Sequence, residues 1–153
     1  MKNRAYRNYI FDFYGTLVDI LTDEKGPVLW DKLGHLYQAY GAAYESETLK
    51  KAYAKRVDQA RKELIELKGV AYPEIDLAHI FNQLYVDARP QSRNSNQPED
   101  WGQLIAMVFR VLSRKHVTAY PHTKEVLAFL KEQGCRIYLL SNAQAAFTTA
   151  ELD

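Results

Sequence analysis

The sequence is poor in the features that mark secreted, membrane and nucleic-acid-binding proteins. Its 153 residues include one cysteine, Cys135, so no disulfide can form within the chain, and we expect a reducing, cytoplasmic location. The net charge of +1 gives no reason to expect a nucleic acid as partner. No apolar run is long enough to span a membrane, and no signal-type stretch follows the basic N-terminus. The 47% of hydrophobic residues suits a globular protein with one core.

The most informative segment lies close to the N-terminus. The apolar run Tyr9 to Phe13 is interrupted by Asp12, and Gly15 follows three residues after that aspartate. Such a run predicts a short buried strand with the carboxylate at its carboxyl end. In open α/β sheets ligands bind at this end of the strands, and a carboxylate there can act as a nucleophile. Asp12 is therefore the first candidate for a catalytic residue.

A second apolar run, Ile137 to Leu140, predicts another buried strand and leads directly into Ser141 and Asn142. The connection between the two runs is long enough for parallel pairing, which would bring Ser141 to the same sheet edge as Asp12. A Ser-Asn pair after a strand is also an ordinary helix N-cap, so this pair taken alone favours a structural role.

Helical periodicity fills most of the chain between these runs. Apolar residues at intervals of three and four predict amphipathic helices that begin near residues 27, 46, 77 and 101, with further helices after His122 and over 143–152. The tyrosines mostly follow these apolar stripes, so we expect them in the core or at its rim. The polar stretch 90–98 predicts a loop.

The pattern Asp12-x-Tyr14-Gly15-Thr16-Leu17, followed much later by Ser141-Asn142, resembles the first two motifs of the haloacid dehalogenase-like superfamily. The resemblance covers essentially the whole chain. It implies an α/β fold whose Rossmann-like parallel sheet core, incomplete in this chain, comprises residues 1–19 and 117–153. It also implies an all-helical cap at 20–116 that folds over the site and excludes water.

The resemblance also implies roles for five residues. Asp12 would be the nucleophile, and Tyr14 stands where phosphatase members usually have a second aspartate as general acid. Mg²⁺ would be held by Asp12 and the backbone carbonyl of Tyr14. Thr16 and Ser141 would bind the anionic group of a small-molecule substrate, with Asn142 in support.

Other polar residues are expected to be non-catalytic. Asp19 is interpreted as a solvated or structural acid. The spacing of the histidines predicts neither a metal site nor a catalytic pair. There are four of them in the sequence: His35, His79, His116 and His122.

Two further elements that the family uses have no counterpart in this sequence: a lysine after the second motif and later acidic residues that hold magnesium. We expect them beyond Asp153, because the last predicted helix has no stop signal. Two predicted strands are also too few for a usual parallel sheet. The sequence thus indicates the amino-terminal portion of a longer protein.

Three functions remain open at this point. Hydrolysis of a phosphate monoester comes first, although a tyrosine at position 14 is a poorer general acid than a carboxylic acid. Dehalogenation of a 2-haloacid needs neither acid nor metal, but Asp31 follows Trp30 where that branch carries an arginine, and its charge would repel the substrate. The third possibility is a binding scaffold or a fragment without activity.

Overall fold

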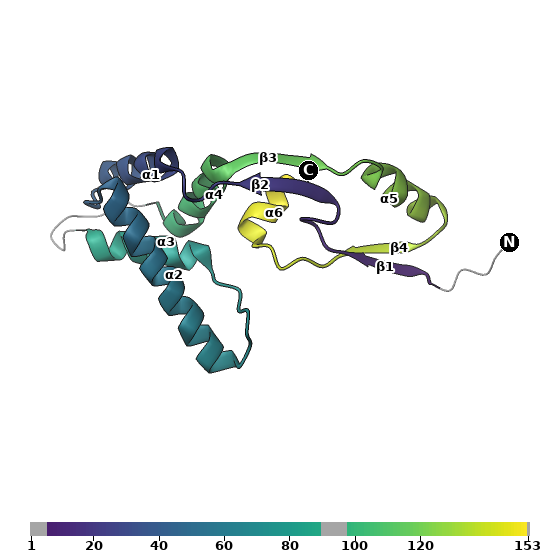
Figure 1. Cartoon of the computed structure of the whole chain (residues 1–153), viewed down its shortest axis with the longest axis horizontal. Coiled ribbons are helices and arrows are strands. Elements are labelled where there is room, and N and C mark those ends of the chain that lie inside the picture. Colours follow the sequence, from purple (N-terminus) through teal and green to yellow (C-terminus); the bar gives the residue numbers. More distant parts are fainter. Residues whose placement is uncertain (1–5, 90–97, 153) are drawn as a thin grey trace. The chain divides into compact units, whose positions relative to one another are not determined.

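The computed structural model describes residues 6–89 and 98–152, and it consists of two compact units (Figure 1). The sheet unit comprises Met1–Asp23 and Arg114–Ala143, and the helical unit comprises Glu24–Ser113 and Gln144–Asp153. Apart from Pro98, the loop expected at 90–98 lies outside the described residues. Within the described part of the chain, no helix is both long and apolar enough to cross a bilayer.

The sheet unit contains the parallel pair that the sequence predicts. Strand β1 (Asn8–Phe11) pairs with β4 (Arg136–Leu139), in a register that sets Phe11 opposite Leu139. Helix α5 (Thr123–Glu132) precedes β4 and buries the side chain of Leu130. Gly134, which follows the end of the helix, adopts a left-handed conformation. A parallel strand pair, whose long connection includes several helices, confirms the predicted α/β class.

The prediction that both strands are buried is wrong. Ile10 and Tyr138 are register partners, and therefore share one face of the sheet, yet their side chains are 64% and 47% exposed. Leu140, on the same face, is 70% exposed. The reason is that α5 is the one helix among the described residues of this unit, and one helix can cover one face only.

A second, antiparallel strand pair in the sheet unit was not predicted. Strand β2 (Val18–Thr22) pairs with β3 (Arg114–Ala119), with an irregular register between Leu21 and Thr22. Most of β3 is exposed, so its sequence has no apolar run that would reveal it. The paired residues of β2 and β3 lie 92 to 101 positions apart in sequence, as the register from Thr22 with Arg114 to Val18 with Ala119 shows, and no short turn signals the pairing.

Three helix ends in the helical unit carry residues that are typical of helix termini. Pro27 stands in the first turn of α1 (Pro27–Ala39), and Gly69 ends α2 (Ser46–Lys68) in a left-handed conformation with φ of 65°. Asp76 caps α3 (Leu77–Ala88) by accepting a 3.0 Å hydrogen bond from the amide of His79. Helix α4 (Trp101–Ser113) follows the residues that are not described.

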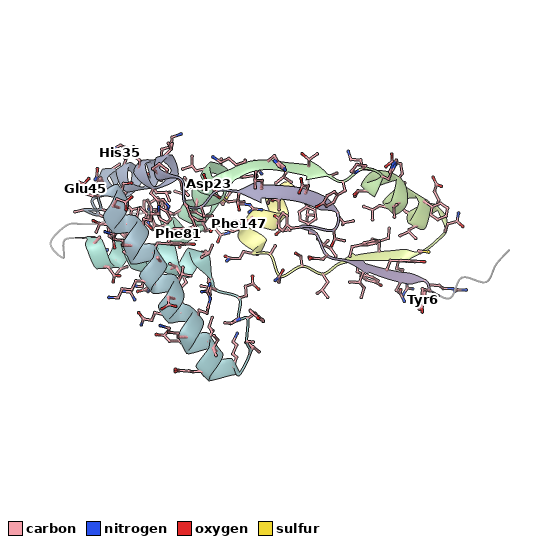
Figure 2. The ribbon with its side chains drawn as sticks, viewed as in Figure 1. Tyr6, Asp23, His35, Glu45, Phe81 and Phe147 are labelled. Carbon is pink, nitrogen blue, oxygen red and sulfur yellow. The ribbon has the colours of Figure 1, made fainter. Side chains whose placement is uncertain are left out.

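Aromatic side chains form the core of the helical unit, as expected for the tyrosines on the apolar stripes. Tyr37 is fully buried, meets Trp101 edge-on at 5.3 Å between ring centroids, and donates a 2.8 Å hydrogen bond to the carbonyl of Phe81. Phe81 lies among the helices (Figure 2) and stacks on Tyr53. The phenol hydroxyl is thus satisfied inside an apolar cluster, which removes the main cost of burying it.

The last described helix, α6 (Ala145–Glu151), packs against α4 within the helical unit, although we expected residues 143–152 to belong with the sheet. Arg110 makes two hydrogen bonds of 2.9 and 3.0 Å to the carboxylate of Glu151 and lies over the ring of Phe147. A buried ion pair and an apolar ring therefore hold this helix on α4. The division into a core of 1–19 and 117–153 and a cap of 20–116 stays a prediction.

Candidate functional site

Asp12 directly follows the last residue of β1, at the carboxyl edge of the parallel sheet. The amide of Leu140 donates a 2.8 Å hydrogen bond to the carbonyl of Phe11, so the pairing of the two strands continues to this edge. The Asp12 side chain is exposed, and its Oδ1 accepts a 2.7 Å hydrogen bond from the amide of Phe13. This contact orients the carboxylate through Oδ1.

The loop after Asp12 is folded tightly around one carbonyl group. The carbonyl oxygen of Phe13 accepts hydrogen bonds from the amides of Thr16 (3.3 Å), Leu17 (2.8 Å) and Val18 (3.1 Å). Gly15 adopts φ of 76°, a left-handed conformation that glycine enters at no steric cost, and its amide bonds to the carbonyl of Val18 at 2.8 Å. The loop therefore has one well-defined backbone path, with Tyr14 and Thr16 on it.

Ser141 stands on the second loop at this edge, two residues after the end of β4. Its Oγ accepts a 3.3 Å hydrogen bond from the amide of Ala143. A hydroxyl that accepts through its oxygen still has its proton to donate. Ser141 can thus be a donor to an anionic oxygen while its side chain is held by its own backbone turn. Asn142, beside it, is exposed.

The structure brings all five predicted site residues to one edge of one sheet. Asp12, Tyr14 and Thr16 lie on the loop after β1, and Ser141 and Asn142 lie on the loop after β4. These two strands are hydrogen-bonded neighbours, and the two loops leave from adjacent strand ends. What each residue does there is not tested by this arrangement, so their roles stay predictions.

Asp19, His116 and Tyr120 form a polar cluster on the antiparallel pair. The Nε2 atom of His116 lies 3.0 Å from Oδ2 of Asp19, and the Tyr120 hydroxyl lies 3.5 Å from Oδ1. The side chains of His116 and Asp19 are about half exposed, so this pair contributes little to stability. Its exposure is compatible with the expectation that Asp19 is a solvated or structural acid.

Thr123 is a residue whose contact with the site loop the sequence did not predict. Its Oγ1 donates a 2.9 Å hydrogen bond to the carbonyl oxygen of Leu17, the last loop residue before β2. The one feature of the sequence that could have drawn attention to Thr123 is its position as the first residue of a helix, two residues after Pro121.

The titration shifts of the helical unit lie away from these loops in sequence. Apart from Lys62, whose pKa is raised by its hydrogen bond to Asp58, they concern tyrosines. Burial raises the pKa of Tyr37 and of Tyr53 far above the ordinary tyrosine value, and burial also raises the pKa of Tyr44. Across residues 6–89 and 98–152 no group of three or more histidine, cysteine or acidic side chains is arranged to hold a metal ion. His35 and His79 are exposed on their helices.

One comparison with known proteins supports the predicted family and fold class. A family model described as haloacid dehalogenase-like hydrolase matches residues 6–153, which is nearly the whole chain. The chain therefore belongs to the haloacid dehalogenase-like hydrolase family, and the predicted resemblance is confirmed. Searches of curated proteins and of solved structures found no significant match. Membership of a hydrolase family implies a small-molecule substrate.

Proposed function

We propose that this protein is a hydrolase that uses Asp12 as its nucleophile on a small anionic metabolite, a phosphate monoester in the first place. The observation that supports this most directly is the hydrogen bond from Leu140 to Phe11, which aligns the strand ends that precede Asp12 and Ser141. A nucleophile and a hydroxyl donor on adjacent loops at this edge are what attack on an anionic centre requires.

In the proposed reaction, Oδ2 of Asp12 attacks phosphorus, a bond from phosphorus to Asp12 forms, and the bond to the leaving oxygen breaks. The leaving alkoxide takes a proton from Tyr14 or from water. Ser141 and Thr16 donate hydrogen bonds to the phosphoryl oxygens, and Asn142 supports Ser141. Water then cleaves the aspartyl phosphate, which releases inorganic phosphate and restores the carboxylate.

Magnesium is the cofactor that this reaction would use, and the site residues suit it. Mg²⁺ prefers oxygen ligands, keeps several waters and is commonly held by one or two carboxylates together with substrate phosphate. The exposed Asp12 carboxylate and the Tyr14 carbonyl supply two such oxygens. Bound there, the ion would neutralise charge on the phosphoryl group.

A second candidate, dehalogenation of a 2-haloacid, is favoured by one observation: the acid position holds Tyr14, and a halide leaves without a proton. In that reaction Asp12 attacks carbon and water cleaves the resulting ester. Against it, Trp30 is buried and donates its indole N–H to the carbonyl of Glu24, while the adjacent Asp31 is exposed and acidic. Asp31 would repel a carboxylate substrate.

Assays against phosphate monoesters and 2-haloacids, each with and without Mg²⁺, distinguish these reactions. We expect phosphate release that EDTA abolishes. Metal-independent halide release would establish the dehalogenase instead, and no turnover of either substrate class would favour a binding scaffold or a fragment without activity.

Two variants test the nucleophile within these assays. Asp12→Asn should abolish turnover, whereas Asp19→Asn, which alters an exposed carboxylate of the same unit, should retain it. Full turnover in the Asp12→Asn variant would remove Asp12 from the mechanism.

A further inference from the structure

The backbone of the loop that carries Asp12 is fixed at its far end by contacts from outside the loop. Inside it, the three amides bonded to the Phe13 carbonyl close the chain on itself. At its end, the carbonyl oxygen of Leu17 accepts two hydrogen bonds, one from the amide of Tyr120 at 3.1 Å and one from Oγ1 of Thr123 at 2.9 Å. Both donors belong to the turn that begins α5.

The turn that supplies these donors is itself in an unfavourable conformation. His122 has φ of 67°, the one positive φ of a non-glycine residue among the described residues, and this conformation is sterically costly for a residue with a Cβ atom. His122 makes no side-chain cap to α5. The turn thus gives up local stability, and its geometry sets the amide of Tyr120 and the hydroxyl of Thr123 against the same oxygen.

We propose that Thr123 is a positioning residue for the Asp12 loop, acting through the carbonyl of Leu17. The amide of Tyr120 is a backbone donor that any residue except proline would supply, whereas the second donor depends on a side-chain hydroxyl. Losing it leaves the loop with one external anchor at this oxygen and widens the range of positions that the Asp12 carboxylate samples. This inference rests on the proposed function in so far as it concerns turnover.

Three variants separate this role from general stability. Thr123→Val removes the hydroxyl at nearly constant volume, and Thr123→Ser keeps it. Thr148→Val is the matched control, because Oγ1 of Thr148 donates a 3.2 Å hydrogen bond to the carbonyl of Gln144 within the helical unit. The first measurement is amide hydrogen exchange of Gly15, Leu17 and Val18, which needs no activity.

We expect Thr123→Val to speed exchange of these loop amides by roughly fivefold relative to the amides of β1 and β4, since a lost hydrogen bond is worth about 1 kcal/mol. Thr123→Ser should restore the wild-type rates, and Thr148→Val should leave them unchanged. Unchanged exchange in Thr123→Val, or an equal rise at every amide of the sheet unit, would overturn the proposal. If Thr123→Val fails to fold, Thr123→Ala takes its place.

The second measurement is steady-state turnover of a phosphate monoester. Thr123→Val should lower kcat by roughly 10-fold to 100-fold with KM changed much less, because misplacement of a nucleophile weakens the chemical step. Thr123→Ser should recover most of kcat. A wild-type protein that turns over no ester would contradict the proposed function, while the exchange data would still decide whether Thr123 anchors the loop. Faster loop exchange with unchanged kcat in an active protein would overturn the positioning role.

Discussion

The amide of Leu140 and the carbonyl of Phe11 are joined by a 2.8 Å hydrogen bond, the last contact between β1 and β4 before the two site loops begin. A predicted site residue directly follows each of these two residues: Asp12 follows Phe11, and Ser141 follows Leu140. This contact fixes where both loops leave the sheet, so strand register sets the starting points of the chain segments that carry Asp12 and Ser141.

Ser141→Ala should weaken catalysis without unfolding the protein. The hydroxyl oxygen accepts a hydrogen bond from the amide of Ala143, and in the proposed mechanism its proton is donated to the substrate. A hydrogen bond to a charged group is worth about 1.5–3 kcal/mol. We therefore expect kcat/KM for a phosphate monoester to fall by roughly 10-fold to 100-fold. Ser141→Thr retains the hydroxyl and should keep most of the activity. Equal kcat/KM for Ser141→Ala and wild type would rule out the donor role.

Gly102→Ala should destabilise the helical unit. A Cβ atom at Gly102 would stand 2.1 Å from the carbonyl oxygen of Ala78, so α3 and α4 could not keep their present approach. Overpacking of this kind costs about 1–3 kcal/mol, measured as the free energy of unfolding in urea.

Gly34→Ala is the matched control for this prediction. Gly34 is also a buried helical glycine, but a Cβ there meets its nearest neighbour, the amide nitrogen of Ser46, at 3.4 Å. The higher helix propensity of alanine, worth up to about 1 kcal/mol, should leave this variant as stable as wild type or more so. Equal losses in the two variants would contradict the close approach of α3 to α4.

Glu151→Gln should be costly because it leaves the guanidinium of Arg110 without its carboxylate. The two side chains are only 13% and 4% exposed, and breaking a buried pair by removing one charge costs about 3–5 kcal/mol. Asp87→Asn, which breaks the more exposed pair with Arg56, should cost about 1 kcal/mol or less. Urea unfolding of both variants measures the difference in free energy of unfolding. A similar loss of stability in each variant would argue against burial of the Arg110–Glu151 pair.

Folding stability should fall at alkaline pH. Burial raises the pKa of Tyr37 and Tyr53 above their unfolded value, so above about pH 10 the unfolded chain ionises while the folded protein does not. Their contribution is fully present below about pH 10. It is lost as pH rises from there through the folded pKa values, at up to about 1.4 kcal/mol per pH unit for each tyrosine.

Urea unfolding as a function of pH tests this slope. Tyr53→Phe should reduce it by one tyrosine's share, whereas Tyr72→Phe should not, because the Tyr72 side chain is 96% exposed. A slope that is the same in wild type and Tyr53→Phe would show that Tyr53 ionises equally in both states.

The helix boundaries were predictable because their signals are local. Pro27, Gly69 and Asp76 act on the residues next to them, through a fixed φ, a left-handed conformation and a side-chain cap. The antiparallel pairing of β2 with β3 was not, because each strand is short, partly exposed and stabilised by a partner distant in sequence. The same holds for the contact of Thr123 with Leu17, which joins residues that are far apart in the chain.

By itself the sequence determined the α/β class, the two strands that precede Asp12 and Ser141, and the helices between them, because periodicity and turn chemistry act over a few residues. Tertiary structure alone decided that α6 packs against α4, that one face of the β1–β4 sheet is exposed, and that the Asp12 loop is anchored at Leu17. Each of these depends on which distant surfaces are available to bury apolar area or to supply a hydrogen bond, and that choice is made over the whole chain.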